Sequence, residues 1–369
     1  MRQRALVGMV LLGLLAAGCG SDDDSGGGLA EGILLSAEGN RLRAYALDDI
    51  ARHQVVVPSA NDAPGAGRDI NGQICITADG LRFIAGEDTG QPVIRAGWGL
   101  FDLHGSRVGD LSATQVGKLA PTYQGGDNAE PYGCGFLSDG RLITTDVGNQ
   151  AAGPANGQVI IWFPPFDEPD PAYCKLDVAF GTAGGVYVDA DDNVYVASAR
   201  ETSGVVRFEP PFPTSNTAAG GCGDTDSTGA PLASGVQRSQ FIAADANIPT
   251  PNGVVGTPGG SFLVSSIING VIAEYDANGT YVRRILEPPA GEMLGPDPYS
   301  TGSPLGIGVD ASGTVYYADL GLVVSGTRIG PGNRTGSVRR IRFAGDQPQA
   351  PETFLVDLNF PDGVGIWEP

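Results

Sequence analysis

Short apolar stretches recur along the chain with the alternating spacing typical of β-strands, and tight turns separate them. The clearest unit spans residues 251–285, where four short runs are interrupted by Gly-rich and Asn-Gly turns. The same frame returns in residues 70–85, 131–146, 183–197 and 304–319. No stretch shows the periodicity of a long amphipathic helix. The pattern predicts an all-β chain of repeated four-stranded sheets, which are the blades of a β-propeller.

The two ends of the repeat region complement each other. Residues 358–367 match the opening strand of a unit whose remainder is missing, and residues 32–45 match a unit without its opening strand. Pairing these segments gives a sixth blade and leaves no open sheet edge. We therefore predict a six-bladed β-propeller, closed by its C-terminal and N-terminal strands in one blade, as a single domain over residues 31–369.

The chain begins with a basic head and an apolar run that ends at Leu15. The run is too short for a comfortable membrane span and small residues follow it, as in cleaved signals. Leu15–Cys19 resembles the bacterial lipobox, whose cysteine becomes the lipidated first residue; an ordinary secretory signal with a chance cysteine is the alternative. We predict a signal peptide over residues 1–18, a lipid on Cys19 and a flexible tether over residues 19–30.

A lipid anchor predicts a location in the cell envelope, with membrane contact through the lipid alone. The residue after the cysteine is Gly20, not Asp, which in the lipoprotein sorting rule favours the outer membrane over the periplasmic side of the inner membrane. The net charge of −20 argues against binding to nucleic acid and against a basic membrane-docking face. The expected partner is a small-molecule ligand or another envelope protein.

The cysteines predict two disulfides. Without Cys19 four cysteines remain, an even number in an oxidising compartment. Three pairings are possible. Cys75 and Cys134 lie in the opening strands of adjacent repeats, and Cys174 and Cys222 lie in connections that flank one repeat, so we favour these two pairs. A zinc site is the alternative, but the sequence has no CxxC motif or Cys/His cluster.

The repeat frame, P-x-G followed by alternating apolar residues and a second strand ending near Tyr-x-Ala, resembles six-bladed propellers of the NHL-repeat and gluconolactonase (senescence-marker-protein) groups. The matching positions are turn glycines and strand apolar residues, which specify blades and not a reaction. The resemblance implies that the opening strands line a central channel and that the residue before the first glycine of each strand reaches one mouth. Around the ring these residues are Asp362, Asn71, Tyr132, Gly184, Asn252 and Leu305.

Oxygen-bearing side chains at three of these positions suggest a divalent cation. Asp362, Asn71 and Asn252 offer the hard ligands that Ca²⁺ or a similar ion prefers. Asn252 and Asp362 match the P-N-G and P-D-G motifs that hold the metal in gluconolactonase-like enzymes, but Leu305 stands in the blade where the family has its P-D-G. Two alternatives stay open: turn-capping roles for these side chains, or a metal-free channel that binds an organic ligand through Tyr132 and Asn71.

The resemblance implies metal-dependent lactone or ester hydrolysis as one function. A bound ion would polarise the carbonyl and acidify a water, and Glu130 or Asp319, acids near the inferred mouth, would act as general base. Strand-terminal acids such as Asp319 alternatively cap turns. A non-catalytic binding or scaffold propeller is the second function. For it, the Pro/aromatic strings at residues 162–166 and 208–213 form either an apolar ligand patch or contacts between blades.

Overall fold

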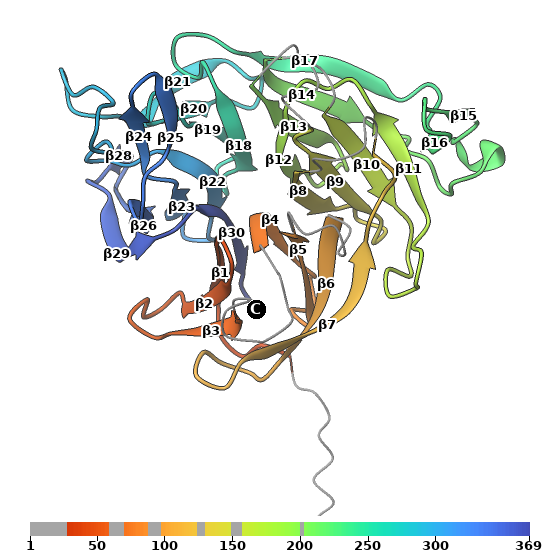
Figure 1. Cartoon of the computed structure of the whole chain (residues 1–369), viewed down its shortest axis with the longest axis horizontal. Helices are drawn as coiled ribbons and strands as arrows, with labels where there is room; N and C mark the ends of the chain where they lie inside the picture. The colour runs from red at the N-terminus through yellow and green to blue at the C-terminus, as the bar shows by residue number, and fades with distance from the viewer. Residues whose placement is uncertain (1–27, 59–69, 88–96, 124–129, 149–156, 200–202) are drawn as a thin grey trace, which may run out of the picture.

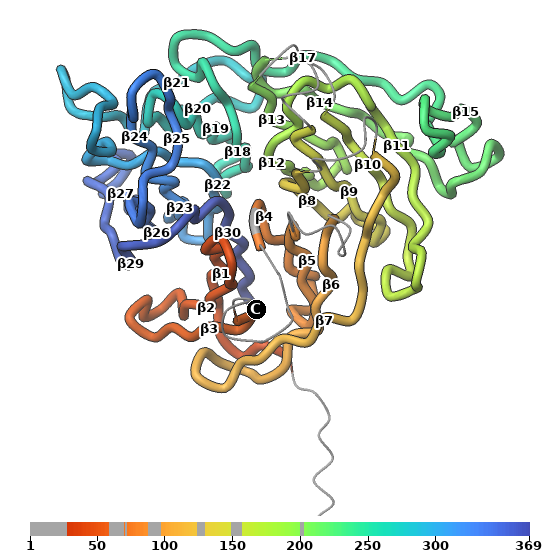
Figure 2. Tube along the Cα trace, in the orientation of Figure 1, coloured from red at the N-terminus to blue at the C-terminus, as the bar shows by residue number. Residues whose placement is uncertain are grey.

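The protein is an all-β ring. The computed structural model describes residues 28–58, 70–87, 97–123, 130–148, 157–199 and 203–369. Six large sheets are arranged radially about one axis, as Figures 1 and 2 show. The only helical element in the described ranges is the 3₁₀ turn η1, Ala218–Gly220. The prediction of a six-bladed β-propeller is confirmed.

Each blade runs from an opening strand at the axis to an edge strand at the rim. From the axis outward, blade 1 has β30 (Pro361–Trp367), β1 (Ile33–Glu38), β2 (Leu42–Ala46) and β3 (His53–Val57); blade 2 has β4 (Ile70–Ile76), β5 (Arg82–Glu87), β6 (Gly97–His104) and β7 (Ser112–Leu119); blade 3 has β8 (Pro131–Phe136), β9 (Leu142–Asp146), β10 (Gln158–Trp162) and β11 (Tyr173–Asp177). Blade 4 has β12 (Ala183–Val188), β13 (Val194–Ser198), β14 (Gly204–Glu209) and β17 (Gln237–Ala243); blade 5 has β18 (Pro251–Gly256), β19 (Phe262–Ser266), β20 (Val271–Tyr275) and β21 (Tyr281–Leu286); blade 6 has β22 (Pro304–Val309), β23 (Val315–Asp319), β26 (Gly336–Ile341) and β29 (Glu352–Leu358).

Insertions decorate this ring. The strands β15 (Asp224–Thr225) and β16 (Pro231–Leu232) extend blade 3 beyond β11. Two small hairpins interrupt blade 6, namely β24 (Leu322–Ser325) with β25 (Arg328–Pro331) and β27 (Phe343–Ala344) with β28 (Gln347–Pro348). These insertions leave the radial arrangement of the six sheets intact.

The ring closes by pairing of the chain ends. In blade 1, β30 runs antiparallel to β1, with Leu34 opposite Ile366 and Ser36 opposite Val364. The opening strand of this blade thus comes from the C-terminus and the other three strands come from the N-terminus, as Figure 1 shows. The predicted closure is therefore confirmed.

Glycines in the opening strands let neighbouring blades approach backbone to backbone. A Cβ atom added at any of six such glycines would lie 1.6–2.8 Å from a carbonyl oxygen of the next blade, closer than real Cβ atoms come to other atoms. Only glycine fits these positions, which is why it recurs in the repeat frame. Each glycine and the carbonyl it faces form a closed series around the axis: Gly72–Tyr132, Gly133–Gly184, Gly184–Asn252, Gly253–Leu305, Gly306–Asp362 and Gly363–Gly72.

The Pro/aromatic strings pack between blades. Trp162 and Phe208 are fully buried, and Phe163 and Phe212 are nearly so. Trp162 lies against Trp98 of the preceding blade, with ring centroids 6.2 Å apart. Of the two alternatives for these strings, the packing role is the one the structure shows.

Both predicted disulfides are present. Cys75–Cys134 joins the opening strands of blades 2 and 3, and Cys174–Cys222 ties β11 to the insertion that carries β15 and β16. The predicted signal peptide and the lipidation residue Cys19 lie outside the described residues. Within the described ranges, no helix has both the length and the apolar character needed to cross a membrane.

Candidate functional site at the entry mouth

The opening strands all begin at one end of the axis, which we call the entry mouth. It is formed by the residue that precedes the first glycine of each opening strand, and the backbone contacts of those glycines place these residues in one ring. Five of the six predicted ring residues are described in full. Asn71 lies in β4, but its side chain falls outside the described part, so its predicted roles stay predictions.

One side of the entry mouth is apolar. Tyr132 and Leu305 are 8% and 6% exposed and belong to the same cluster as Leu320 and Leu322. Leu294, in the connection between blades 5 and 6, is partly buried against this cluster. The cluster gives an apolar surface on which the hydrophobic part of a ligand can lie.

Tyr132 of blade 3 contacts blade 1, on the far side of blade 2. Its hydroxyl donates a hydrogen bond to the backbone carbonyl of Asp362, 3.1 Å away. Burial, and then the negative charge of Asp362, raise the pKa of the Tyr132 phenol well above its usual value. Tyr132 is therefore a neutral hydrogen-bond donor over the whole physiological pH range. Asp362 itself is buried, with 2% of its surface exposed.

Asn252 carries a buried acceptor without a partner. Its Oδ1 atom is shielded from solvent and accepts no hydrogen bond from any residue in the described part of the chain. An unsatisfied buried acceptor costs about 1–3 kcal/mol. A ligand that donates a hydrogen bond to this oxygen would recover that free energy, so Asn252 is the ring residue most suited to recognition.

The described ring residues by themselves offer fewer oxygen ligands than a protein-bound Ca²⁺ ion takes. Ca²⁺ takes about six to eight oxygen ligands, whereas this ring offers the Asp362 carboxylate and the Asn252 amide oxygen, with Leu305 between them. The described residues hold no group of three or more His, Cys, Asp or Glu side chains. Asn71 is the third predicted ligand and is not placed, so the divalent-cation prediction stays a prediction.

Asp319 is buried and fully engaged. One carboxylate oxygen accepts hydrogen bonds from the Ser303 and Gly321 amides, at 2.6 and 2.9 Å. The other accepts from the Ser337 hydroxyl at 2.6 Å and lies 3.0 Å from the Arg339 guanidinium. These contacts fit a structural cap and leave no lone pair directed at a substrate. They agree with the turn-capping alternative, and the catalytic role predicted for Asp319 stays a prediction.

Glu130, the other predicted general base, is exposed just ahead of β8. Its backbone carbonyl accepts a hydrogen bond from Val147, 2.9 Å away, which fixes the chain at the strand entry. Asp146, which corresponds in the repeat to Asp319, is buried, and its Oδ1 accepts from the Gly148 amide at 2.8 Å. The role of Glu130 stays a prediction.

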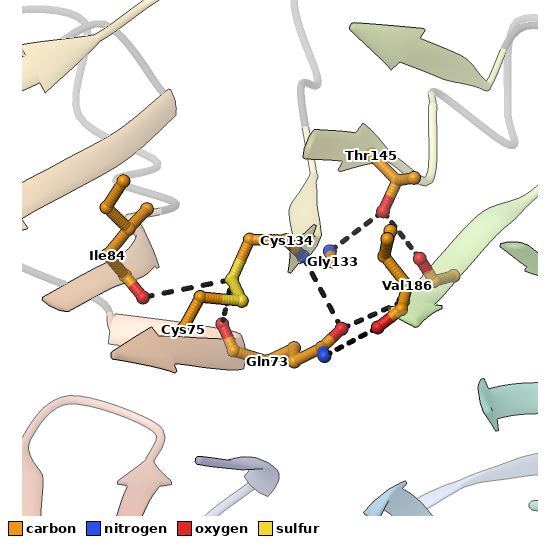
Figure 3. The surroundings of a disulfide bond; sticks show 8 residues. Gln73, Cys75, Ile84, Gly133, Cys134, Thr145 and Val186 are labelled. Atoms are coloured by element: carbon orange, nitrogen blue, oxygen red, sulfur yellow. Dashed lines mark hydrogen bonds between the residues drawn. A yellow bond between two sulfur atoms is a disulfide. The ribbon is translucent and has the colours of Figure 1, made fainter. Parts of the chain in front are cut away.

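Gln73 is a hub residue that the sequence did not reveal. Its amide nitrogen donates to the Val186 carbonyl and its amide oxygen accepts from the Val186 amide, both at 2.8 Å. The same oxygen accepts a longer bond of 3.4 Å from the Cys134 amide. Figure 3 shows Gln73 reaching from blade 2 past the disulfide of Cys134 to blade 4. No sequence signal marks this contact, because its partners are far apart in the chain.

The fold defines the structural class of this protein, which is a six-bladed β-propeller closed by its chain ends. No family model matches the chain, and no curated protein matches it. A Bacteroides caccae protein of unknown function is similar in structure at 12% identity and a TM-score of 0.52, with 92% of this chain and 100% of that chain covered. A luciferin-regenerating enzyme is similar at 12% identity and a TM-score of 0.54, with 91% and 97% covered.

A gluconolactonase from Xanthomonas campestris is also among the structures similar to this chain, at 14% identity and a TM-score of 0.49, with 79% of this chain and 84% of that chain covered. Identities this low establish the fold alone. The predicted resemblance to six-bladed propellers is confirmed at the level of the fold by the six radial sheets and by the two structures with TM-scores above 0.5.

Proposed function

We propose that this protein is a lipid-anchored propeller of the cell envelope that binds a small molecule at the entry mouth. The observation that carries the proposal is the buried Asn252 Oδ1, which has no hydrogen-bond partner among the described residues. It lies in the same ring as Tyr132 and Leu305, which supply an apolar surface. The ligand that fits is one with an apolar body and a hydroxyl, amide or amine donor.

We place binding ahead of lactone hydrolysis. Both carboxylate oxygens of Asp319 accept hydrogen bonds from described residues, and Glu130 is exposed at a strand entry. A general base must come within hydrogen-bond reach of the proton that it removes. Binding requires no such base, so it needs only the polar and apolar groups that the ring contains.

The position of the N-terminal segment supports an orientation for the anchored protein. Leu29 is buried with Val108 and Leu111, and the Ala30 amide donates to the Ser106 carbonyl at 2.8 Å. These partners lie in the turn between β6 and β7, at the end of the ring opposite the entry mouth. A lipid on Cys19 would hold that end toward the bilayer and leave the entry mouth facing away from it.

Thermal-shift screening of the purified protein tests the proposal. The library contains sugar lactones, small alcohols and amines with apolar groups, and Ca²⁺, and it is applied to wild type, Asn252→Leu and the exposed control Asn333→Leu. We expect at least one organic ligand to raise the Tm of wild type and of Asn333→Leu but not of Asn252→Leu. Asn252→Leu itself should raise the Tm of the free protein, because it removes the unsatisfied acceptor.

Two outcomes would count against the proposal. One is a ligand-induced shift that persists in Asn252→Leu, since the ligand would then bind elsewhere. The other is the absence of any shift in wild type across the library. Turnover of a lactone that a chelator abolishes would favour the hydrolase over the binding protein.

A further inference from the structure

A second concavity lies between blades 5 and 6, at the end of the ring opposite the entry mouth. We call it the interblade groove. It has a volume of about 310 Å³ and is bounded by the turns at residues 257–259 and 311–313 and by the β27–β28 hairpin. This volume is at the lower end of the range for small-molecule sites, about 300–1,000 Å³. The groove shares no described residue with the entry mouth.

The floor of the interblade groove is apolar. Leu263 of β19 and Val315 of β23 line it and are 2% and 1% exposed. Phe343 of β27 adds an aromatic ring that is partly buried against the same cluster. A flat, weakly polar face of a ligand can pack on this floor at little desolvation cost.

One wall carries a fixed pair of opposite charges. The Arg283 guanidinium donates through Nε to Glu274, 2.6 Å away, and through Nη1 to the Asp346 carbonyl. It also lies over the Phe343 ring, 5.9 Å from its centroid. The other Glu274 oxygen accepts from the Ser261 hydroxyl at 2.8 Å. Both charged groups are held in place before any ligand arrives, which lowers the entropy cost of binding.

The charge balance selects against anions. Glu274 neutralises Arg283, the exposed Asp346 adds a further negative charge to the lining, and the whole chain carries −20. The guanidinium has five N–H donors, and described residues engage two of them. The wall therefore offers both donors and acceptors to a ligand without favouring a negative one.

We infer that the interblade groove binds one neutral sugar ring. An apolar floor accepts the C–H face of a sugar, and a planar guanidinium–carboxylate pair matches adjacent hydroxyl groups, each of which donates and accepts. The rim is open, because a Cβ atom added at Gly313 or Gly345 would meet nothing within 4 Å. The bound ring can thus belong to a longer glycan.

Saturation-transfer NMR with titration tests this inference. The probes are methyl glucoside, methyl galactoside and N-acetylglucosamine, with glucuronate as the anionic comparison. Gly259 lines the groove, and a Cβ atom added there meets only the Thr257 hydroxyl, at 3.6 Å, so Gly259→Trp fills the space without a backbone clash. Gly330→Trp, at a glycine with open space outside the groove, is the matched control. Arg283→Lys keeps the charge and removes the planar fork.

We expect saturable binding of at least one neutral sugar, no binding of glucuronate, and retention of binding in Gly330→Trp and in Asn252→Leu. Gly259→Trp should abolish binding, and Arg283→Lys should weaken it by about tenfold, the effect of losing one charge-assisted hydrogen bond. Binding that survives Gly259→Trp, equal binding of glucuronate, or no binding of any neutral sugar would overturn the inference. Because Asn252→Leu acts only at the entry mouth, failure here is separable from failure of the proposed function.

Discussion

Replacing Gly363 by alanine tests how tightly the ring is closed. A Cβ atom at this position would lie 1.6 Å from the Gly72 carbonyl oxygen. Carbon–oxygen contacts in proteins are about 3.3 Å or longer. Blades 1 and 2 would therefore have to separate by about 1.7 Å, the difference between these two distances, to admit a single methyl group.

The expected cost is set by overpacking. Forcing extra atoms into a close-packed site costs about 1–3 kcal/mol, and more when backbone must move. We predict that Gly363→Ala lowers the free energy of unfolding by about 3 kcal/mol or more. Gly306→Ala, whose added Cβ would lie 2.6 Å from the Asp362 carbonyl oxygen, should cost less. Gly330→Ala, with open space around it, should stay within about 0.5 kcal/mol of wild type.

Urea unfolding followed by tryptophan fluorescence measures this series, because Trp98 and Trp162 are completely buried in the folded protein. Should Gly363→Ala fail to fold, Gly306→Ala still provides a measurable value. The reasoning would be refuted if both substitutions had the same small effect as Gly330→Ala, because the opening strands could then not be in backbone contact.

Three further predictions concern the second disulfide, the Asp226 carboxylate and the lipid anchor. Replacing Cys174 and Cys222 together by alanine should lower stability by about 4 kcal/mol on the loop-entropy estimate for a sequence separation of 48 residues; urea unfolding of the double variant, without reductant, checks this, and an unchanged midpoint would contradict it. Burial opposes ionisation of Asp226, but hydrogen bonds from Lys175 and from its own loop outweigh burial and lower its pKa to about 2 from 3.8. Because the folded-state pKa is below the unfolded value, this stabilisation is complete above about pH 4 and is lost as the pH falls toward 2. Denaturation across that range should show that wild type loses roughly 2 kcal/mol more stability than Asp226→Asn does, and equal losses would contradict the prediction. Finally, Cys19→Ser should move the expressed protein from the membrane fraction to the soluble fraction, and its retention in the membrane fraction would argue against the lipid anchor.

The fold could be predicted because its signals are local. Asn-Gly and Asp-Gly turns, alternating apolar residues and a glycine in each opening strand identify blades one at a time. The closure could be predicted because residues 358–367 and 32–45 are complementary parts of one repeat. The Cys75–Cys134 disulfide followed from the same repeat, since these two cysteines occupy neighbouring opening strands.

The candidate site could be predicted only in part, because its chemistry depends on contacts between blades. The repeat identified Asn252 and Asp362 as ring residues, but not that Asn252 Oδ1 is buried without a described partner. Gln73 bonds to Val186, 113 positions away, and Tyr132 bonds to Asp362, 230 positions away. For Asp319 the sequence left catalysis open beside capping, and it could not show the four partners that the carboxylate has in the fold.

Native-state hydrogen exchange of the strands β1 and β30 tests the closed ring most directly. The backbone pairing of Leu34 with Ile366 and of Ser36 with Val364 makes both strands part of one blade. The account predicts that amides of residues 34–36 and 364–366 that lie in this pairing exchange with the same high free energy, at or near that of global unfolding. Rapid exchange of residues 364–366 while β2 and the other blades stay protected would contradict it, because the C-terminal strand would then not hold the ring together.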